Sequence, residues 1–368
     1  MAHINVDPIY EATDRDDFAT MIEVGRYTRR SSDFDELIER THDHFWNPLD
    51  ADYIDFSTPF DMKAETLIPE DMIAEFNSAI GDQIDESRRV EFTNENARFI
   101  LSQILHGEQG ALSLSSSLCQ ILVDPGAVEY ASNQVREEAR HVTAFTEYMK
   151  ARFEGRPYEV GHMLGTLMKD VYVAPEVYKK LVGMQMLIEG LAMGAFATLH
   201  MQARDPLLQR LVRLVMTDEA FHHKFGKIWA DKTIDRLPEE ERNTVEDWAA
   251  SCFQALLYNL AGANQKAALY ERFGVDPEWA MGAMAEAFTD SDRRKLMQRP
   301  ANIFRVLIKT LHRSNIITER TRHTYAAWID MDELKAEDDR MVGDDIAEAG
   351  ILELRDINES KDLGPARV

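Results

Sequence analysis

Cysteine is scarce in this chain of 368 residues, with Cys119 and Cys252 as its only two examples. Neither lies at metal-ligand spacing from another cysteine or from a histidine, which argues against a disulfide framework, a cysteine-based zinc site or an iron–sulfur cluster. Both fall within apolar helical patterns, so we expect buried free thiols. A glycine-rich dinucleotide-binding fingerprint is also missing from the sequence.

Basic residues are too few to balance the acidic ones: 41 Lys and Arg stand against 65 Asp and Glu, a formal net charge of −24. Such a chain repels phosphate backbones and anionic lipid heads, so we expect neither nucleic acid nor a membrane as a partner. Residues 1–20 carry many acids and no apolar run of signal-peptide length, which favours the cytoplasm. The most membrane-like run, Leu181–Met201, contains Gln185 and Glu189, and we interpret it as a helix buried on most sides.

Alternating β-branched runs are nearly absent, and apolar residues recur at helical spacing, so the sequence predicts an all-α fold. Two short links, Asp124-Pro125-Gly126 and Asp205-Pro206, each join a pair of antiparallel helices. The segment Glu154–Ala174 between the pairs is long enough to cross over along a bundle. This is the connectivity of a ferritin-like four-helix bundle. The four helices expected are Glu91–Val123, Ala127–Phe153, Pro175–Ala203 and Pro206–Ile234.

Residues 91–234 thus form the expected bundle, and residues 1–90 precede it as an N-terminal wrap. Within the wrap we expect one helix at Asp33–Phe45 and another at Pro69–Asp82, where Pro69 suits the first turn. The stretch Trp46–Pro59 between them is punctuated by prolines and predicts irregular backbone.

Residues 235–329 add further helices to the same domain at its C-terminal side. They are expected at Glu239–Phe273, Pro277–Phe288 and Arg299–Ala327. Residues 330–368 are rich in charge and poor in aromatics, which favours a flexible tail or a surface wrap.

An offset of 81 residues relates the two helix pairs. It carries Glu108 onto Glu189, Glu138 onto Glu219, His141 onto His222 and the turn Asp124-Pro125 onto Asp205-Pro206. In each pair the lone Glu lies 16 residues before the turn Asp, and a Glu-x-x-His motif begins 14 residues after it. At about 1.5 Å rise per residue, both groups lie roughly 20 Å from the turn. We therefore expect all six side chains to meet in one layer.

The six residues have the chemistry of a two-metal site. Residues three apart share a helix face, so each Glu-x-x-His motif supplies one oxygen and one nitrogen to the same ion. The lone Glu108 and Glu189 complete or bridge the pair of ions. Both lie in apolar runs, where an ionised Glu is rarely found unless it is paired or bound to metal. Four carboxylates and two imidazoles offset most of the charge of two divalent ions and leave open coordination positions.

Three neighbouring residues are expected to support these ligands. A metal-bound histidine usually donates its second ring N–H to a carboxylate. Asp218 is placed to serve His141, and Glu137 is placed to serve His222. Arg140 either neutralises these outer carboxylates or makes an ordinary surface ion pair.

On these motifs, the chain resembles the ferritin-like di-iron carboxylate oxidoreductases of the ribonucleotide-reductase-like group. Residues 137–141 (Glu-Glu-Ala-Arg-His) and 218–222 (Asp-Glu-Ala-Phe-His) look like the two signature motifs of that group. Its members include reductase small subunits, multicomponent monooxygenase hydroxylases, acyl-carrier-protein desaturases, aldehyde-deformylating oxygenases and arylamine N-oxygenases. The likeness covers about Glu91–Ile234 and is specific for the metal site rather than for the reaction.

At several positions this chain differs from individual subgroups, and these differences reduce the number of reactions that the resemblance implies. Reductase small subunits usually hold a radical on a tyrosine where this chain has Phe145, and they use a tyrosine in the C-terminal tail, whereas no tyrosine follows Tyr325. The hydroxylases carry a threonine at the place of Met193. The arylamine N-oxygenases carry an additional histidine at the place of Val215.

Small residues flank the lone ligands and are interpreted in two compatible ways. They leave space for oxygen and an organic substrate, or they let helices pack closely through glycine. The expected lining of a substrate pocket comprises Gly107, Ala111, Phe145, Gly190, Met193 and Phe221.

The resemblance implies an O2-activating non-haem di-iron oxidoreductase of monooxygenase type, which hydroxylates, N-oxygenates or desaturates a small, largely apolar organic substrate. Its implied cofactors are two iron ions, or a manganese–iron pair, with O2 as co-substrate. Electrons are expected from a separate ferredoxin or reductase, because the chain has neither a nucleotide fingerprint nor a cysteine cluster. We also expect a homodimer.

Three alternatives stay open. One is a radical-generating subunit of the reductase kind, and another is a ferritin-like iron-oxidising protein, against which the length and the extra helices argue. The third is a bundle that has kept the ligands for stability and has lost catalysis.

Overall fold

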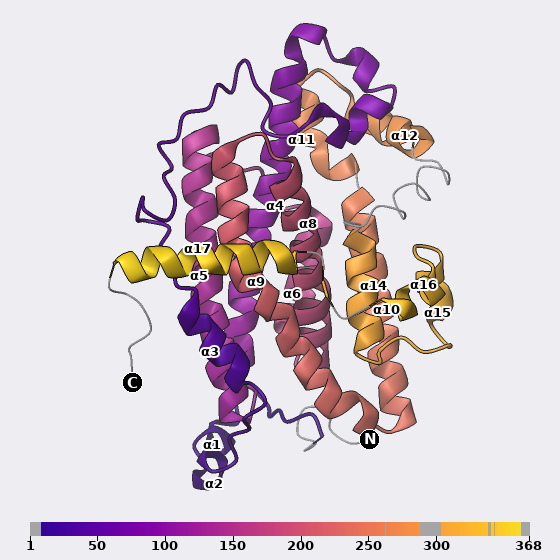
Figure 1. The fold of residues 1–368 in the computed structure, drawn as a ribbon. Helices are drawn as coiled ribbons and strands as arrows, with labels where there is room; N and C mark the ends of the chain where they lie inside the picture. The colour runs from indigo at the N-terminus through magenta and orange to yellow at the C-terminus, as the bar shows by residue number, and fades with distance from the viewer. Residues whose placement is uncertain (1–8, 262, 288–302, 338–339, 342, 362–368) are drawn as a thin grey trace.

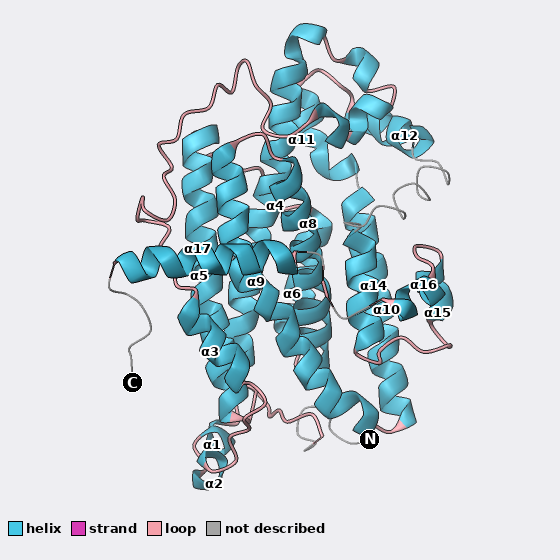
Figure 2. Cartoon of the chain, in the orientation of Figure 1, coloured by secondary structure: helices cyan, strands magenta, loops and turns pink. Residues whose placement is uncertain are grey.

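The computed structural model describes residues 9–261, 263–287, 303–337, 340–341 and 343–361. Regular structure in these ranges is helical, apart from one isolated antiparallel bridge between Ala12 and Leu122 (Figure 2). The predicted all-α class is therefore confirmed.

The first long pair consists of α4 (Arg89–Leu118) and α5 (Pro125–Phe153). Asp124 caps α5, because its Oδ1 accepts a hydrogen bond of 2.8 Å from the Gly126 N–H. Helix α4 ends at Leu118, before the predicted Val123. The backbone of the following residues bonds to the N-terminal segment instead, with the Val123 N–H donating to the Glu11 carbonyl at 3.0 Å.

The second long pair repeats this plan. Its first rod runs through α7 (Val177–Lys180), η5 (Leu181–Ile188) and α8 (Glu189–Gln202), and its second is α9 (Pro206–Thr233). Asp205 caps α9 as Asp124 caps α5, accepting from the Leu207 N–H at 3.0 Å. The middle of the first rod, η5, is π-helical. Such distortions are uncommon and frequently mark functional sites.

The four long segments pack side by side along the centre of the molecule (Figure 1). Helix α4 packs on α5, α8 packs on α9, and α5 contacts α9. The crossover between the pairs contains a helix that the sequence did not predict, α6 (His162–Val173), which packs on α4 and α10 (Glu239–Ala261).

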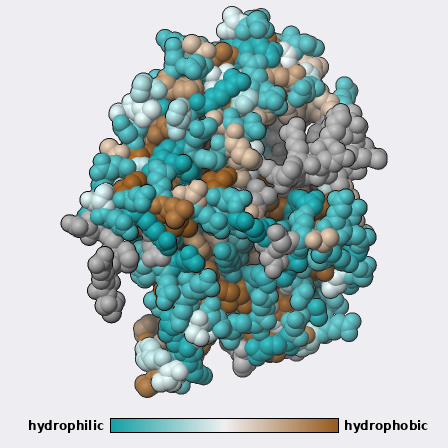
Figure 3. All heavy atoms as spheres, viewed as in Figure 1, coloured by the Kyte–Doolittle hydropathy of each residue, from teal (hydrophilic) through white to brown (hydrophobic). Residues whose placement is uncertain are grey.

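The N-terminal region begins with α1 (Phe18–Met21), α2 (Val24–Tyr27) and α3 (Asp35–Asp43). Helix α3 confirms the expected helix in this region, and residues 44–59 contain only turns and coil, as expected. Helices α1 and α2 form a projecting tip (Figure 1). The face shown in Figure 3 is mostly hydrophilic, but Phe18 and Val24 on the tip are exposed.

The prediction of a helix at Pro69–Asp82 is wrong. Short 3-10 turns occupy this region: η1 (Glu70–Met72), η2 (Ala74–Asn77), η3 (Gly81–Gln83) and, before α4, η4 (Glu86–Arg88). Ile73 adopts extended backbone and interrupts the helix. Glu75 turns into the core, where it accepts hydrogen bonds from Lys266 and Tyr270.

The C-terminal helices are shorter than the sequence predicts. The expected helix Glu239–Phe273 is divided, because α10 ends at Ala261 and is followed by η7 (Ala263–Lys266) and α11 (Ala267–Arg272). Helix α12 (Pro277–Ala287) matches its prediction, except that Phe288 lies outside the described residues.

The helix expected at Arg299–Ala327 is also wrong in extent. Residues 299–302 lie outside the described ranges, and α14 spans only Ile303–Arg313. A turn with Asn315 at φ +56° separates it from α15 (Arg322–Ala326).

The described part of the charged tail contains two helices, which fits the surface wrap, one of the two alternatives expected, rather than the flexible tail. Residues 330–361 contain α16 (Met331–Ala336) and α17 (Asp344–Ser360). Helix α17, yellow in Figure 1, crosses α9 and buries Ile351 and Leu354. Residues 362–368 lie outside the described part.

Within the described residues, one helix, Val177–Gln202, is long and apolar enough to cross a membrane by length and composition. Of its most apolar window, 78% is buried inside the molecule. The prediction of a helix buried on most sides is thus confirmed. Of the two cysteines, Cys252 is buried as expected, whereas Cys119 is only partly buried.

Candidate metal centre

The six predicted ligands come from four helices. Glu108 lies on α4, Glu138 and His141 lie on α5, Glu189 begins α8, and Glu219 and His222 lie on α9. All six are buried, and the most exposed of them, Glu108, retains 5% of its surface. The predicted convergence of these side chains is confirmed.

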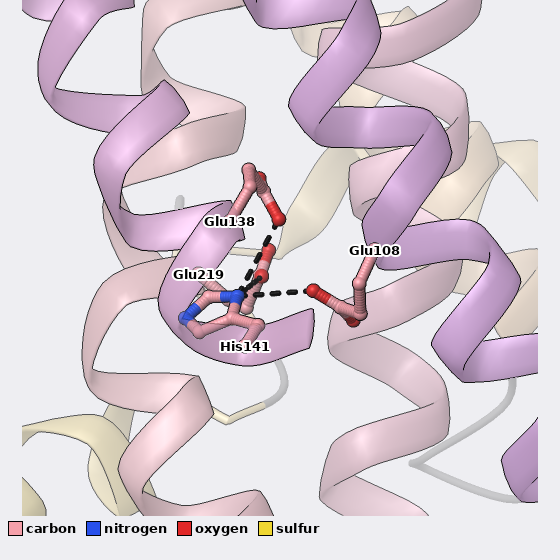
Figure 4. Close-up of side chains that lie close together, drawn as sticks. All are labelled: Glu108, Glu138, His141 and Glu219. Carbon is pink, nitrogen blue, oxygen red and sulfur yellow. Dashed lines mark hydrogen bonds and ion pairs between the residues drawn. The ribbon is translucent and has the colours of Figure 1, made fainter. Parts of the chain in front are cut away.

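The ligand atoms form two overlapping groups, in each of which all atoms lie within 4.8 Å of one another. One group is Glu108, Glu138, His141 and Glu219, which Figure 4 shows pointing at a common centre. The other is Glu138, Glu189, Glu219 and His222. The two groups share Glu138 and Glu219.

The Nδ1 atom of His141 faces the first group. It lies 3.0 Å from Glu108 Oε2, 3.4 Å from Glu138 Oε2 and 3.2 Å from Glu219 Oε1. Three carboxylates therefore surround a single imidazole nitrogen.

The Nδ1 atom of His222 occupies the matching place in the second group. It lies 3.1 Å from Glu138 Oε1, 3.2 Å from Glu219 Oε2 and 3.7 Å from Glu189 Oε2. Each shared carboxylate thus directs one oxygen to each group, which is the arrangement of a bridging ligand. If two ions bind here, Glu138 and Glu219 would bridge them, and Glu108 and Glu189 would each complete one group.

The donor set fits two divalent cations. Metal–ligand bonds of about 2.1 Å place adjacent donor atoms about 3.0 to 3.4 Å apart in octahedral or tetrahedral geometry. Most of the separations around the two Nδ1 atoms fall in this range. In addition, Glu138 Oε2 is buried and accepts no hydrogen bond from a described residue. A buried carboxylate oxygen in that position is costly unless a cation binds it.

The outer ring nitrogens of both histidines bond to the carboxylates predicted for them. His141 Nε2 lies 2.8 Å from Asp218 Oδ2, and His222 Nε2 lies 3.0 Å from Glu137 Oε2. Such contacts fix the orientation of the ring and direct Nδ1 at the centre. The predicted pairing of both outer carboxylates is confirmed.

Arg140 is buried and belongs to this outer layer rather than to the surface. Its Nη2 donates to Asp218 Oδ2 at 2.6 Å, and its Nη1 donates to the Trp46 carbonyl at 3.2 Å. The first of the two interpretations of Arg140 is therefore confirmed.

Two residues of the N-terminal wrap reach the centre without having been predicted. His44 Nε2 lies 3.1 Å from Asp218 Oδ1, at ion-pair distance though outside hydrogen-bond geometry, and 3.8 Å from Glu137 Oε1. The Trp46 Nε1–H donates to Asp218 Oδ2 at 2.9 Å. No periodicity in the wrap marks them, and the only sequence signal is an aromatic and imidazole pair next to the end of α3.

Two glutamines on the opposite side were also missed. Gln134, one turn before Glu138 on α5, donates to Glu189 Oε1 at 2.8 Å and to Glu138 Oε1 at 3.3 Å. Gln185, in the π-helical segment, donates to Gln134 Oε1 at 2.8 Å. The i, i+4 spacing of Gln134 and Glu138 is the signal that predicts this contact.

Burial and mutual contact shift the ionisation of the cluster. Burial raises the pKa of Glu108 to about 8 and the pKa of Glu189 well above its usual range. Burial opposes a charge on Glu138 and Glu219 as well, but the neighbouring histidines outweigh it and lower the pKa of both. The surroundings therefore favour the protonated acid at Glu108 and Glu189 and the charged carboxylate at Glu138 and Glu219.

The histidines complement these carboxylates. Burial acts to lower the pKa of His141 and His222, but the surrounding carboxylates reverse its effect and raise both pKa values well above 6.5. For Asp218, burial is outweighed by Arg140, His141 and His44, which hold its pKa well below the usual range. The metal-free cluster thus stores protons that a bound cation would displace.

The residues expected to line a pocket have different surroundings. Gly190 lies against α14, where an added Cβ would be 3.2 Å from Leu307 Cδ2, so it serves close helix packing. Gly107 has no heavy atom within 4 Å of the position of a Cβ. Phe145 stacks on Phe196 with ring centroids 5.9 Å apart.

The remaining three are all buried. They are Ala111, Met193 and Phe221. Phe221 stacks on His44 at 5.3 Å and so borders the outer layer of the site. A surface depression lined by Pro59, Phe60, Asp61, Glu65, Arg204 and Pro206 contains none of the expected pocket residues.

Comparisons with known proteins leave the family open. No protein-family model matches the chain, and no curated protein matches it. The function is therefore argued from the residues of the buried centre.

Proposed function

We propose that the chain is an O2-activating non-haem di-iron oxidoreductase with a ferritin-like bundle formed by α4, α5, α9 and the rod η5–α8. One observation carries the proposal: two ligand groups share the carboxylates of Glu138 and Glu219, and each group has its own histidine. Shared carboxylates hold two ions close together, which a mononuclear or purely structural site does not require.

The ligand types favour a redox-active metal. Four carboxylates balance the charge of two divalent ions, and two neutral imidazoles add donors that suit iron and manganese better than magnesium or calcium. When bound, a reduced iron pair, or a manganese–iron pair, supplies the electrons that activate O2 for hydroxylation, N-oxygenation or desaturation of an organic substrate.

The chain's own residues prepare this chemistry. Asp218 and Glu137 hold the two histidine rings in place, and Arg140 balances the charge of Asp218. Phe145 and Met193, each four residues beyond a proposed ligand on its helix, are buried, and apolar side chains of this kind help to keep a site dry. These surroundings support a small and largely apolar substrate.

Electrons must reach the buried centre from outside, and we propose a separate ferredoxin or reductase as the donor. A hydrogen-bonded chain leads from the Trp46 indole through Asp218 to His141. The Trp46 ring also stacks on His141 with centroids 6.2 Å apart. An aromatic side chain linked to a ligand in this way suits the passage of single electrons.

The proposal is tested by loading the protein anaerobically with two equivalents of Fe(II) and then admitting O2. We expect O2 consumption together with a transient visible absorbance, and conversion of a candidate substrate when a chemical reductant is present. Product analysis by mass spectrometry then gives the reaction type.

The matched control is the same protein loaded with Zn(II), which takes N and O ligands but has no redox chemistry. The protein must bind Zn(II), and the Zn(II)-loaded protein must consume no O2. Fully iron-loaded protein that oxidises Fe(II) without an organic product would support an iron-oxidising role, and iron-loaded protein that is inert to O2 would contradict the proposal.

The Trp46–Asp218–His141 chain also favours a second candidate, a radical-generating subunit. The place of its expected radical tyrosine is taken by Phe145, which is packed on Phe196. A stable tyrosyl signal in electron paramagnetic resonance after exposure to O2 would favour this candidate over the first.

A further inference from the structure

The sequence repeat pairs each residue of one half of the centre with a residue of the other half. The six ligands obey this pairing, because Glu108 corresponds to Glu189 and the two Glu-x-x-His motifs correspond to each other. The two halves can therefore be compared residue by residue, and any pair that differs in type distinguishes one half from the other.

At two paired positions, one half has a polar side chain where the other half has an apolar one. Gln134 corresponds to Val215, and Gln185 corresponds to Ile104. Both glutamines are fully buried beside Glu189, and Val215 is equally buried on α9. The half that contains Glu189 thus has an amide pair where the half that contains Glu108 has two aliphatic side chains.

The amide pair holds the terminal ligand of its half. The Gln134 Nε2–H donates to Glu189 Oε1 at 2.8 Å, which leaves Glu189 Oε2 directed at the His222 side. Gln185 holds Gln134 in turn through the 2.8 Å bond to its Oε1. Gly226 on α9 lets the helices close on this contact, because a Cβ there would lie 2.9 Å from Gln185 Cβ.

Glu108 lacks such support. Among the described residues its only hydrogen-bonding and ion-pairing partner is His141, which belongs to the same ligand group. Its neighbour Gly107 has open space where a side chain would stand. Glu189 is therefore held by a side chain outside its own ligand group, whereas Glu108 is held only from within its group.

We infer that Gln134 makes the two metal positions unequal: the Glu189–His222 position binds its ion more tightly, and the Glu108–His141 position exchanges its ion and its ligands more readily. The inference rests on the proposed function for the presence of two ions. A fixed outer contact prepares a ligand for binding, and removal of such contacts typically weakens metal binding 10- to 100-fold. Gln134 is a positioning residue in this account, since it acts through Glu189.

The test is an anaerobic titration with Co(II), whose visible absorbance reports each ion bound. Wild-type protein is expected to bind in two steps. Glu189→Gln should remove the tighter step, and Glu108→Gln should remove the weaker one. Loss of the weaker step in Glu189→Gln and of the tighter step in Glu108→Gln would overturn the inference.

The decisive variant is the double substitution Gln134→Val with Gln185→Ile, which copies the residues of the other half. We expect the tighter step to weaken by about 10- to 100-fold and to approach the weaker one, which should not move. Using both changes avoids leaving either amide unpaired, and far-ultraviolet circular dichroism checks the fold. Glu147→Gln, on the outer side of α5, is the matched control.

The outcomes separate the inference from the proposed function. If wild-type protein binds no Co(II), both fail. If it binds two ions with one affinity, the inequality fails. If the double variant keeps both wild-type steps, the role assigned to Gln134 fails. In both cases the two-metal function stands.

Discussion

Asn358, near the end of α17, donates a hydrogen bond of 2.9 Å from its Nδ2 to the Phe45 carbonyl. Its Oδ1 accepts a second bond, 2.6 Å long, from the Tyr53 hydroxyl. Phe45 stands between His44 and Trp46, both of which contact Asp218 at the centre. The C-terminal helix therefore holds the segment that completes the outer layer of the site.

This contact predicts that Asn358→Ala weakens metal binding from a distance. Loss of both bonds releases the Phe45 backbone, so that His44 and Trp46 hold Asp218 less firmly. We expect Co(II) affinity to fall about 10-fold while the helical content is kept. Ser360→Ala is the control, because among the described residues the Ser360 hydroxyl bonds only to the Ile357 carbonyl of its own helix. An affinity as high as that of wild type would show that α17 does not position the site.

A second prediction separates bridging from terminal ligands. Glu138→Gln or Glu219→Gln removes a carboxylate that both groups share, and each variant is expected to lose both ions. Glu108→Gln or Glu189→Gln affects a single group and is expected to keep about one ion per chain.

Iron content by mass spectrometry after Fe(II) loading and desalting measures this stoichiometry. Glu147→Gln, whose carboxylate pairs with Lys150 outside the centre, should keep both ions. Two ions retained by either shared-ligand variant would contradict the assignment of bridging roles.

The convergence of the six side chains was predictable from the sequence. In a helix, the number of residues from the turn fixes how far along the bundle a side chain lies. The repeat of Asp124 and Asp205 as caps sets the start of α5 and α9, and a constant rise per residue then places both Glu-x-x-His motifs at one level. The outer contacts of Asp218 and Glu137 followed from the same repeat, since each lies directly beside a ligand.

The contacts of the wrap could not be predicted in this way. Trp46 is 172 residues from Asp218 along the chain and reaches it through irregular backbone, which has no period. The same reason explains the error at Pro69–Asp82, where inward contacts of Glu75 override the helical pattern. The sharing of Glu138 and Glu219 between the two groups also needed coordinates, because spacing alone does not tell which oxygen faces which histidine.

A third prediction concerns Arg140, which makes a buried ion pair of 2.6 Å with Asp218. Arg140→Leu leaves a buried carboxylate with less compensation, and we expect the free energy of unfolding of the metal-free protein to fall by about 3 kcal/mol. Urea denaturation followed by circular dichroism measures the change. Arg30→Leu, which removes ion pairs with the exposed Asp35 and Glu129, should cost much less. Equal decreases in the free energy of unfolding of the two variants would show that the buried ion pair contributes no more to stability than the exposed ones.

The last prediction follows from the protons held by the metal-free centre. Burial raises the pKa of Glu108 from 4.5 to about 8, so folding favours the protonated acid and this contribution is lost as pH rises towards 8. His141 and His222, with raised pKa values, act in the same direction, since their favourable charge is lost as pH rises through the folded-state pKa. The stability of the metal-free protein should therefore fall from about pH 4.5 upward, where unfolded Glu108 is already ionised, and more steeply above about 6.5, where the histidines contribute too.

Bound cations should reverse this trend, because they take the place of the protons. Loading with two ions is expected to release protons from His141, His222, Glu108 and Glu189, because the pKa values of all four groups are raised. A pH indicator in weak buffer measures the release, and urea denaturation at several pH values compares the metal-free and Zn(II)-loaded proteins. The metal-free protein should lose stability as pH rises and the loaded protein should gain it. Parallel curves for the two forms would mean that cations do not bind to these four side chains.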